Sequence, residues 1–397
     1  MPVAAIFNQK AARWVRGRRG QFEKLRAAIG DTRNIVWIHC ASLGEFEQGR
    51  PLIEALRKNY PDIHILLTFF SPSGYEVRKD YKEADWVFYL PMDGARNARL
   101  FLDIVQPVLV IFVKYEFWYY YLKKVKYRNI PLLLVSALFW EKMSFFRWYG
   151  ALQRKILSRF DHLFVQDRTS AALMEGIGLG KITSISGDTR FDRVTAIAAS
   201  SQPVPYIERF LVPGATIVAG STWPDDEELL KQLIDKVPGI SLIIAPHEIN
   251  EAHLAGIEAR FPGIARYSRL DSESKGNLIL IDNIGLLSRL YRHAAITYIG
   301  GGFGRGIHNT LEAAVYGRPV IFGPVYHKFR EAKELIEKCG AFSVSGDAAL
   351  IELVQRLIND RQFYQKSATA AGDYVQANRG ATEKIMAFIQ ENRLLTR

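Results

Sequence analysis

The sequence has only two cysteines, Cys40 and Cys339, in 397 residues. A disulfide-rich scaffold is therefore excluded, and a reducing compartment such as the cytoplasm suits the chain. The chain also has no run of about 20 apolar residues, the length that an α-helix needs to span a bilayer. The apolar stretch 1–7 is too short for a secretory signal, and one interpretation is that it is the remnant of a longer apolar segment.

Metal-binding patterns are missing as well. The sequence shows no cluster of cysteine and histidine at metal-ligand spacing, so no metal site is predicted. Hydrophobic residues make up 48% and charged residues 23% of the chain, which is the balance of a folded globular protein and not of a disordered one. The length favours two domains of about 150–200 residues each.

Negative charge is in deficit, because the formal net charge is +11, and this predicts an acidic partner. The positive charge concentrates in two segments, 10–26 and 114–159, and the second is interleaved with aromatic residues. Lysine and arginine beside tryptophan and tyrosine favour a membrane headgroup interface. Two alternatives stay open: single-stranded nucleic acid, whose bases stack on aromatic rings, and core aromatic rings beneath solvated charges. The residues assigned to the interface are Arg16, Arg18, Arg19, Lys123, Lys124 and Trp148.

Apolar runs alternate with amphipathic stretches along the chain, which predicts βαβ units and parallel sheets. A proline-containing run at 200–214 interrupts this alternation. We therefore predict an α/β fold of two Rossmann-like, doubly wound domains, 1–199 and 200–397, with a ligand in the cleft between them. The second domain ends in helices, of which the last is able to pack back on the first domain. Strands are expected at 34–40, 63–69, 107–113, 131–136, 161–166, 215–220, 240–245, 277–282, 294–299 and 318–322.

The most distinctive local pattern is a glycine-rich turn within residues 300–319. Glycines let the backbone approach a ligand closely, and we expect a helix at 308–317 to present free amides to an anion. Asn309 and Glu312 have two open interpretations. They either form a helix cap with a capping-box glutamate, or bind a phosphate and a ribose diol respectively. Arg305 and His308 would add donors to the phosphate.

Three other loops of the second half also follow strands and are expected at the same cleft. Ser221 and Thr222 either bind phosphate or cap the next helix. His247 either hydrogen-bonds a base or phosphate, or is a structural histidine. The segment 282–285 offers backbone groups to a nucleobase. Together these loops predict a nucleotide-binding site.

Polar residues follow strands of the first half too. Glu45 begins a helix and is either a first-turn glutamate favoured by the helix dipole or a general base. A helix N-terminus lowers the pKa of a carboxylate whereas burial raises it, so both interpretations stay open. Glu116 either forms an ion pair with a nearby lysine or arginine, or belongs to the site. Arg190 either faces a developing phosphate charge or forms a surface salt bridge.

Taken together, these motifs occur in an order that resembles one family. They are ASLGE at 41–45, EFW at 116–118, GDTRFD at 187–192, GST at 220–222, APHE at 245–248, DNIG at 282–285 and GIHNTLEAA at 306–314. The set is similar to the 3-deoxy-D-manno-octulosonic acid (Kdo) transferases of lipopolysaccharide synthesis. The resemblance covers about residues 33–345, and its specificity comes from the order of the motifs.

The resemblance implies a GT-B fold and transfer of Kdo from CMP-Kdo to a lipid A precursor, lipid IVA, at the cytoplasmic face of the bacterial inner membrane. It implies that the lipid acceptor and the anionic membrane surface are partners, and that neither a metal nor another cofactor takes part. Glu45 would be the general base of an inverting displacement, while Glu116 and Arg190 would support the transition state. The predicted donor-binding residues are Ser221, Thr222, Pro246, His247, Ile284, Gly285, Leu286, Gly302, Arg305, Asn309, Thr310, Leu311 and Glu312.

The chain departs from the family pattern at three positions. Lys114 stands in place of a frequent glutamate, and Asp188 and Arg190 replace the commoner asparagine and lysine. Arginine keeps the charge but cannot serve as a proton donor. Two other functions stay open: a non-hydrolysing nucleotide-sugar epimerase, and a nucleotide-sugar-binding or lipid-binding protein at the membrane. Nucleic acid is not expected as a partner, because the sequence contains no recognised nucleic-acid-binding module.

Overall fold

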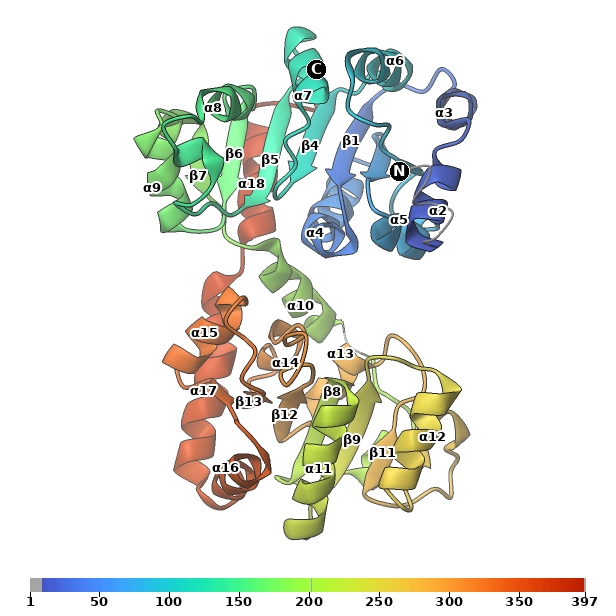
Figure 1. Ribbon diagram of the computed structural model, residues 1–397, viewed down its shortest axis with the longest axis vertical. Helices are drawn as coiled ribbons and strands as arrows, with labels where there is room; N and C mark the ends of the chain where they lie inside the picture. The colour runs from blue at the N-terminus through green and yellow to red at the C-terminus, as the bar shows by residue number, and fades with distance from the viewer. Residues whose placement is uncertain (1–8, 201, 396–397) are drawn as a thin grey trace. The chain divides into compact units, whose positions relative to one another are not determined.

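A computed structural model describes residues 9–200 and 202–395 of the chain (Figure 1). The apolar stretch 1–7, interpreted above as a remnant, lies outside this part. Helices and parallel strands alternate along the chain, as the spacing of its apolar runs predicts. Within the described ranges, no helix is both long and apolar enough to cross a membrane.

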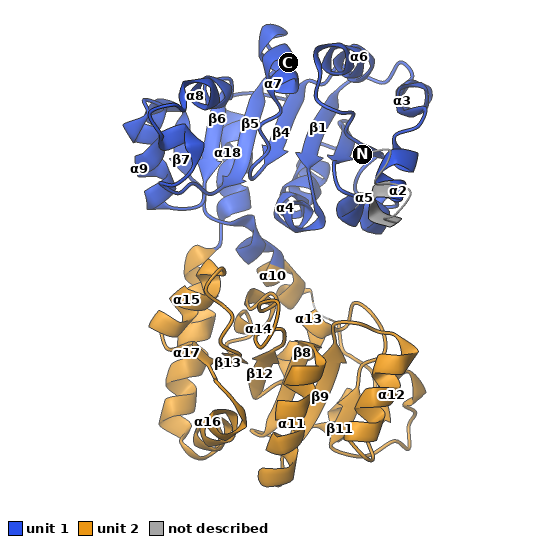
Figure 2. Ribbon diagram, viewed as in Figure 1, with its two compact units in different colours: residues 1–193, 379–397 blue, residues 194–378 orange. Residues whose placement is uncertain are grey.

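The chain forms two compact units, which Figure 2 colours separately. The first combines the chain up to Arg193 with residues 379–397, and the second comprises residues 194–378. The division falls inside helix α10 (Thr189–Ala199), a few residues before the expected boundary. The last helix, α18 (Ala381–Glu391), packs on a helix of the first unit, so the second unit is shorter than the expected domain.

The first unit is built on a seven-stranded parallel sheet in the order β3-β2-β1-β4-β5-β6-β7. Its strands are β1 (Ile35–Cys40), β2 (His64–Phe69), β3 (Trp86–Tyr89), β4 (Leu109–Val113), β5 (Leu132–Ala137), β6 (His162–Val165) and β7 (Thr183–Ile185). Its helices before α10 are α2 (Gln9–Gly17), α3 (Gln21–Ile29), α4 (Leu43–Asn59), α5 (Pro72–Arg78), α6 (Ala95–Val105), α7 (Tyr119–Tyr127), α8 (Ala151–Leu157) and α9 (Arg168–Gly176). The strand order reverses between β1 and β4, and open α/β sheets bind ligands at such a switch point.

Helices cover both faces of this sheet, which explains why its central strands β1 and β4 are buried along their whole length. Side chains of a strand alternate between the two faces. Trp37 therefore packs with residues of α6 and α7, whereas its neighbour Ile38 packs with residues of α4 and α18. The helix that carries Glu45 thus rests directly on the centre of the sheet.

The second unit repeats the plan with a sheet in the order β10-β11-β9-β8-β12-β13-β14. Its strands are β8 (Thr216–Thr222), β9 (Ser241–Pro246), β10 (Ala265–Arg266), β11 (Leu278–Leu280), β12 (Ile296–Ile299), β13 (Val320–Phe322) and β14 (Ala341–Ser343). Its helices are α11 (Pro224–Lys236), α12 (Glu251–Arg260), α13 (Leu287–Leu290), α14 (Leu311–Ala314), α15 (Arg330–Glu337), α16 (Asp347–Asn359) and α17 (Arg361–Asn378). The switch point of this sheet lies between β8 and β12.

Each predicted strand is present, with ends that differ by up to two residues in most cases. The strands outside the predicted ranges, β3, β7, β10 and β14, are short and form the edges of their sheets. The predicted helix at 308–317 is wrong, because α14 has only four residues. Gly317 adopts a φ of 60°, and Pro319 follows it, so the chain turns there instead of continuing as a helix.

Candidate functional site

Several of the polar residues that the sequence singles out lie at the switch point of their sheet. In the first unit, Glu45 follows β1 and Glu116 follows β4, the two strands at the switch point. In the second unit, the loop after β8 and the glycine-rich segment after β12 hold the equivalent place. The carboxyl ends of parallel strands lie along one edge of a sheet, so each unit carries its own candidate site.

Glu45 lies in the first turn of α4 and is partly buried. Its Oε2 accepts hydrogen bonds from the backbone N–H of Ser42 at 2.8 Å and from the Ser42 hydroxyl at 3.0 Å, so it also caps the helix. Burial first, and then the negative charge of Glu116, raise the pKa of Glu45 and outweigh the Ser42 hydrogen bonds, which lower it. The effect of burial on the pKa of Glu45 is therefore larger than that of the helix N-terminus. A raised pKa suits a proton acceptor.

Glu116 lies just beyond β4 and is 9% exposed. Its Oε2 accepts a hydrogen bond from Trp118 Nε1, and His39 Nε2 lies 3.2 Å from the same oxygen. Within the described residues, its partners are thus a tryptophan and a histidine, and not the lysine or arginine of the alternative interpretation. The Glu116 charge raises the pKa of Glu45, so the two carboxylates act on each other.

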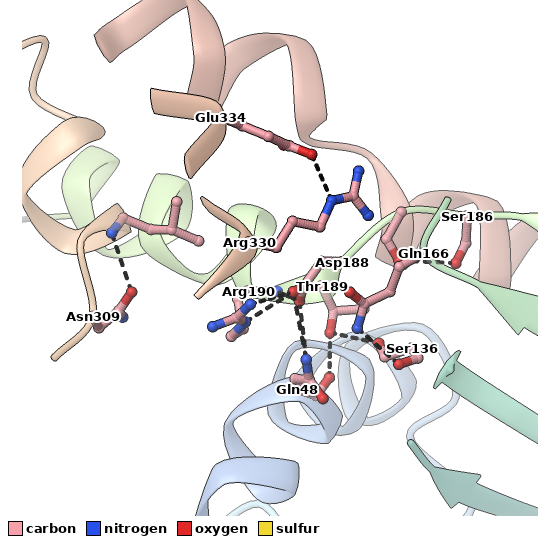
Figure 3. Close-up of polar contacts among 12 residues, drawn as sticks. Gln48, Ser136, Gln166, Ser186, Asp188, Thr189, Arg190, Asn309, Arg330 and Glu334 are labelled. Carbon is pink, nitrogen blue, oxygen red and sulfur yellow. Dashed lines mark hydrogen bonds and ion pairs between the residues drawn. The ribbon is translucent and has the colours of Figure 1, made fainter. Parts of the chain in front are cut away.

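Arg190 is held by the residue two positions before it. Its Nε and one terminal nitrogen lie 2.9 and 2.7 Å from Oδ2 of Asp188, and its backbone N–H donates to Oδ1 at 2.9 Å. Figure 3 shows how this pair is tied to α4: Gln48 Nε2 lies 3.4 Å from Asp188 Oδ1, and the Thr189 hydroxyl donates to the backbone oxygen of Gln48 at 2.5 Å. The segment that carries Arg190 is therefore fixed to α4, the helix whose first turn contains Glu45.

The basic and aromatic block of the first unit divides between surface and core. Trp148 is 90% exposed and Tyr127 is 82% exposed, whereas Phe145 is buried in the core. Lys124 Nζ lies 5.8 Å from the centroid of the Tyr127 ring. The interpretation as core aromatic rings therefore holds for Phe145 but not for Trp148 and Tyr127, which are exposed. The exposed cations of the predicted interface are Arg16, Arg19 and Lys123.

Arg18 has a different environment from the other predicted interface residues. Its guanidinium lies 4.0 Å from the Trp14 ring centroid and donates to the backbone oxygens of Phe70 at 2.9 Å and Leu90 at 3.2 Å. Burial lowers the pKa of Arg18 to about 10. Arg18 therefore has a structural role, because it fixes the end of α2 to the loops after β2 and β3. This differs from the membrane contact that its charge predicted.

In the second unit, three aromatic rings stack beyond the ends of the central strands. The Trp223 and His247 rings are 4.8 Å apart between centroids, and the His247 and His308 rings are 4.3 Å apart. Trp223 Nε1 donates to His308 Nε2 at 3.3 Å, and Arg305 lies 5.2 Å from the Trp223 ring. Trp223 and Arg305, with glycines of the glycine-rich segment, line a hollow of about 230 Å³.

The protonation state of His308 follows from this stack. Burial, and then His247, lower the pKa of His308 to about 4, so its ring is neutral at pH 7. A neutral ring whose Nε2 accepts from Trp223 carries no positive charge toward a phosphate. Arg305 is therefore the cation of this segment that suits an anionic ligand.

Asp226, which is 1% exposed, ties the two loops of this site together. Its Oδ2 accepts from the backbone N–H of Gly301 at 2.8 Å and of Trp223 at 2.9 Å, and its Oδ1 accepts from the Tyr298 hydroxyl at 2.7 Å. The glycine-rich segment is therefore held in a fixed position relative to α11.

Asn309 and Thr222 have intramolecular hydrogen-bond partners, and the cap of α11 is Trp223 instead of Ser221 or Thr222. The Asn309 side chain accepts from the backbone N–H of Leu311 at 3.1 Å and donates to Glu312 at 2.9 Å. Thr222 is fully buried and its hydroxyl donates to Glu227 at 3.1 Å. These polar groups already have intramolecular partners, so a ligand would reach them only as an additional partner.

The remaining predicted donor-binding residues differ in exposure, and two of them are glycines in tight backbone positions. Ile284 is 92% exposed, and Gly285 has a φ of 98°, so this loop is an open turn. A Cβ at Gly302 would lie 2.4 Å from the backbone nitrogen of Gly323, so only glycine fits there. The other members of the predicted set, Pro246, Thr310 and Leu311, are buried, whereas Leu286 and Ser221 are partly buried.

Sequence reasoning passed over three residues that organise these sites: His39, Trp223 and Asp226. Trp223 and Asp226 follow β8 at the start of α11, and their position beside Ser221 was the signal that could have found them. His39 lies within a strand that the sequence marks only as apolar, and no local pattern distinguishes it.

Comparison with known proteins bears on the family and the fold of the chain. A family model described as 3-deoxy-D-manno-octulosonic-acid transferase (kdotransferase) matches residues 13–193. A Kdo transferase of Aquifex aeolicus is 28% identical over 90% of this chain and 97% of its own length. One of Haemophilus influenzae is 25% identical over 89% of this chain and 86% of its own length. The similarity to Kdo transferases that the order of the motifs predicts is thus confirmed over nearly the whole chain. The chain is therefore a glycosyltransferase, as predicted.

Similar solved structures show the fold. The UDP-GlcNAc 2-epimerase of Neisseria meningitidis superposes with a TM-score of 0.63 at 16% identity, covering 90% of this chain and all of the other. MurG of Acinetobacter baumannii gives a TM-score of 0.56 at 12% identity, covering 91% of this chain and all of the other. At such low identity the likeness to an epimerase concerns the fold alone, and the predicted GT-B fold is confirmed.

Proposed function

We propose that this glycosyltransferase moves Kdo from CMP-Kdo to a lipid A precursor, lipid IVA, at the cytoplasmic face of the inner membrane. The observation that carries the proposal is the pair Glu45 and Glu116 at the switch point of the first unit. Burial and the neighbouring charge raise the pKa of Glu45, as a general base requires. Neither a metal nor another cofactor is part of the proposed reaction.

The proposed reaction is a single displacement with inversion. Glu45 takes the proton of an acceptor hydroxyl as that oxygen forms a bond to the anomeric carbon of Kdo. The bond between this carbon and the phosphate oxygen of CMP breaks, and CMP leaves with the bonding electrons. Arg190 stabilises the negative charge that develops on the departing phosphate, and Glu116 supports the transition state. The new glycosidic bond replaces the bond to CMP, and the proton remains on Glu45.

The second unit is the proposed donor site. Arg305 provides positive charge beside the glycine-rich segment, which Asp226 holds in place. The Trp223–His247–His308 stack provides a flat aromatic surface at the same strand ends. A cytosine ring or the phosphate of CMP suits this combination of stacking surface and cation.

The exposed part of the basic and aromatic block is the proposed membrane contact. Trp148, Tyr127 and Lys123 are exposed on the first unit, and this combination suits lipid headgroups. An acceptor with phosphates and acyl chains would be drawn to the same surface by charge and by apolar contact.

Release of CMP from CMP-Kdo, with and without a tetra-acylated lipid A precursor in detergent, tests the proposal. We expect release that depends on the acceptor. Release without any acceptor would indicate a hydrolase of the donor, and saturable CMP binding with no release would indicate a binding protein. A nucleotide-sugar epimerase would instead convert a soluble donor without releasing the nucleotide as a stable product.

A further inference from the structure

His39 lies beside Glu116 in the interior of the first unit. It is the fifth residue of β1, is fully buried, and stands in register with Thr68 of β2 and Phe112 of β4. A polar ring buried between strands destabilises the fold unless its nitrogens are hydrogen-bonded. Both ring nitrogens of His39 have partners, and one partner is a residue of the proposed site.

The hydrogen bonds around His39 fix where its proton lies. Nδ1 lies 2.9 Å from the Thr68 hydroxyl and 3.1 Å from the Thr68 carbonyl oxygen. Trp37 Nε1 donates to the same hydroxyl at 2.8 Å, which leaves the hydroxyl proton for Nδ1. The other acceptor in reach of that proton, the backbone oxygen of Ile38, is farther away at 3.4 Å. The neutral ring therefore carries its proton on Nε2, which faces Glu116.

The opposite tautomer would turn a lone pair of Nε2 toward the Glu116 carboxylate, and two acceptors repel each other. A doubly protonated ring would donate from Nδ1 to the Thr68 carbonyl and still donate from Nε2 to Glu116. In both favourable states a chain of hydrogen bonds runs from Trp37 through Thr68 and His39 to Glu116.

Two donors thus converge on one oxygen of Glu116. His39 Nε2 and Trp118 Nε1 both reach Oε2. Among the described residues these are the hydrogen-bond partners of the Glu116 side chain, so Oε1 keeps its lone pairs for another group. We infer that His39 is a positioning residue for Kdo transfer, which orients the Glu116 carboxylate through Nε2 and is itself held by the Thr68 hydroxyl. The inference rests on the proposed role of Glu116.

The test compares His39→Asn with His39→Gln. Asparagine places its polar group near the position of Nδ1 and does not reach Glu116, whereas the longer glutamine places an N–H near the position of Nε2. We expect His39→Asn to lower kcat about tenfold or more with little change in the KM for CMP-Kdo, and His39→Gln to recover most of the loss. Equal losses in the two variants, or a loss confined to KM, would overturn the inference.

His162→Asn is the matched control. His162 is also a strand histidine with a hydroxyl partner, Ser184 Oγ at 2.8 Å, but it lies at the start of β6, away from the carboxyl ends. Its kcat should stay near that of the wild type. If His39→Asn does not fold, Thr68→Val provides the second measurement, because it removes only the hydroxyl. A reduced kcat with unchanged CMP binding supports the inference, and a normal kcat overturns it.

Glu116→Gln separates this inference from the proposed function. If Glu116→Gln keeps a normal kcat, the proposed role of Glu116 is refuted, and the role of His39 falls with it. If Glu116→Gln lowers kcat, adding His39→Asn should cause little further loss, because the second change removes a group with nothing left to position. Losses that multiply in the double variant would refute the role of His39 alone.

Discussion

Replacement of Glu45 by glutamine separates a catalytic role from a structural one. Glutamine is nearly isosteric, and its side-chain oxygen can still accept the two hydrogen bonds from Ser42, so the cap of α4 is kept. What it loses is the ability to take a proton. A general base contributes about 10²–10⁴-fold to a rate, which corresponds to about 2.7–5.4 kcal/mol of transition-state stabilisation. We expect kcat for acceptor-dependent CMP release to fall by a factor in that range.

Glu45→Gln should lower activity but should not lower the stability of the fold. The pKa of Glu45 is raised in the folded protein, so its ionised form is disfavoured there relative to the unfolded chain. At pH values above this raised pKa, the charge lowers the free energy of unfolding, and the loss disappears as the pH falls and the group is protonated. Glu45→Gln should therefore unfold at the same temperature as the wild type or higher at neutral pH, as measured by thermal unfolding.

Glu47→Gln is the control, because Glu47 lies on the same helix and forms an ion pair with Arg78 at 2.9 Å on the outside of the unit. Its kcat should be close to that of the wild type. Near-normal turnover of Glu45→Gln would refute the assignment of the base. A fall in activity that is matched by a large fall in unfolding temperature would also contradict the reasoning, because the capping role would then explain it.

Further predictions follow from the same geometry. The acid limb of the kcat profile should lie above the ordinary glutamate range, because the pKa of Glu45 is raised; a limb near pH 4 would contradict this. Asp188→Asn should lower kcat with little change in CMP binding by calorimetry, because it weakens the hold on Arg190; an unchanged kcat would argue against that role. The pKa of His308 is lowered to about 4, so stability should decline as pH falls below about 6.5 and less so in His308→Phe, as thermal unfolding would show; parallel curves would refute it. Trp148→Ala should reduce cosedimentation with anionic vesicles, whereas unchanged binding would remove Trp148 from the interface.

The sequence predicted the two sheets because each strand carries its own signal. A parallel strand that is covered on both faces is a continuous apolar run; β4 follows this rule along its whole length, and β1 departs from it only at His39. Short edge strands carry no such signal; β10, for example, has only two residues. The helix predicted at 308–317 is too long, because its helical pattern continues as far as Gly317, where the chain turns.

The site was predictable as far as its residues lie at strand ends. Glu45, Glu116 and Arg190 follow strands, and the order of their motifs pointed to the Kdo transferases, to which the comparisons find this chain similar. Residues that act through contacts distant in sequence were not predictable. The proposed role of His39 depends on its contact with Glu116, which is far along the chain. Arg18 packs against Trp14 and donates to carbonyl groups of other loops, which its sequence position does not reveal.

The mass of the lipid after incubation with CMP-Kdo tests Kdo transfer most directly. We expect the tetra-acylated precursor to gain the mass of one Kdo residue, or of a whole multiple, in step with the CMP released. An unchanged lipid mass while CMP is released would contradict it, because the donor would then be hydrolysed and no sugar transferred.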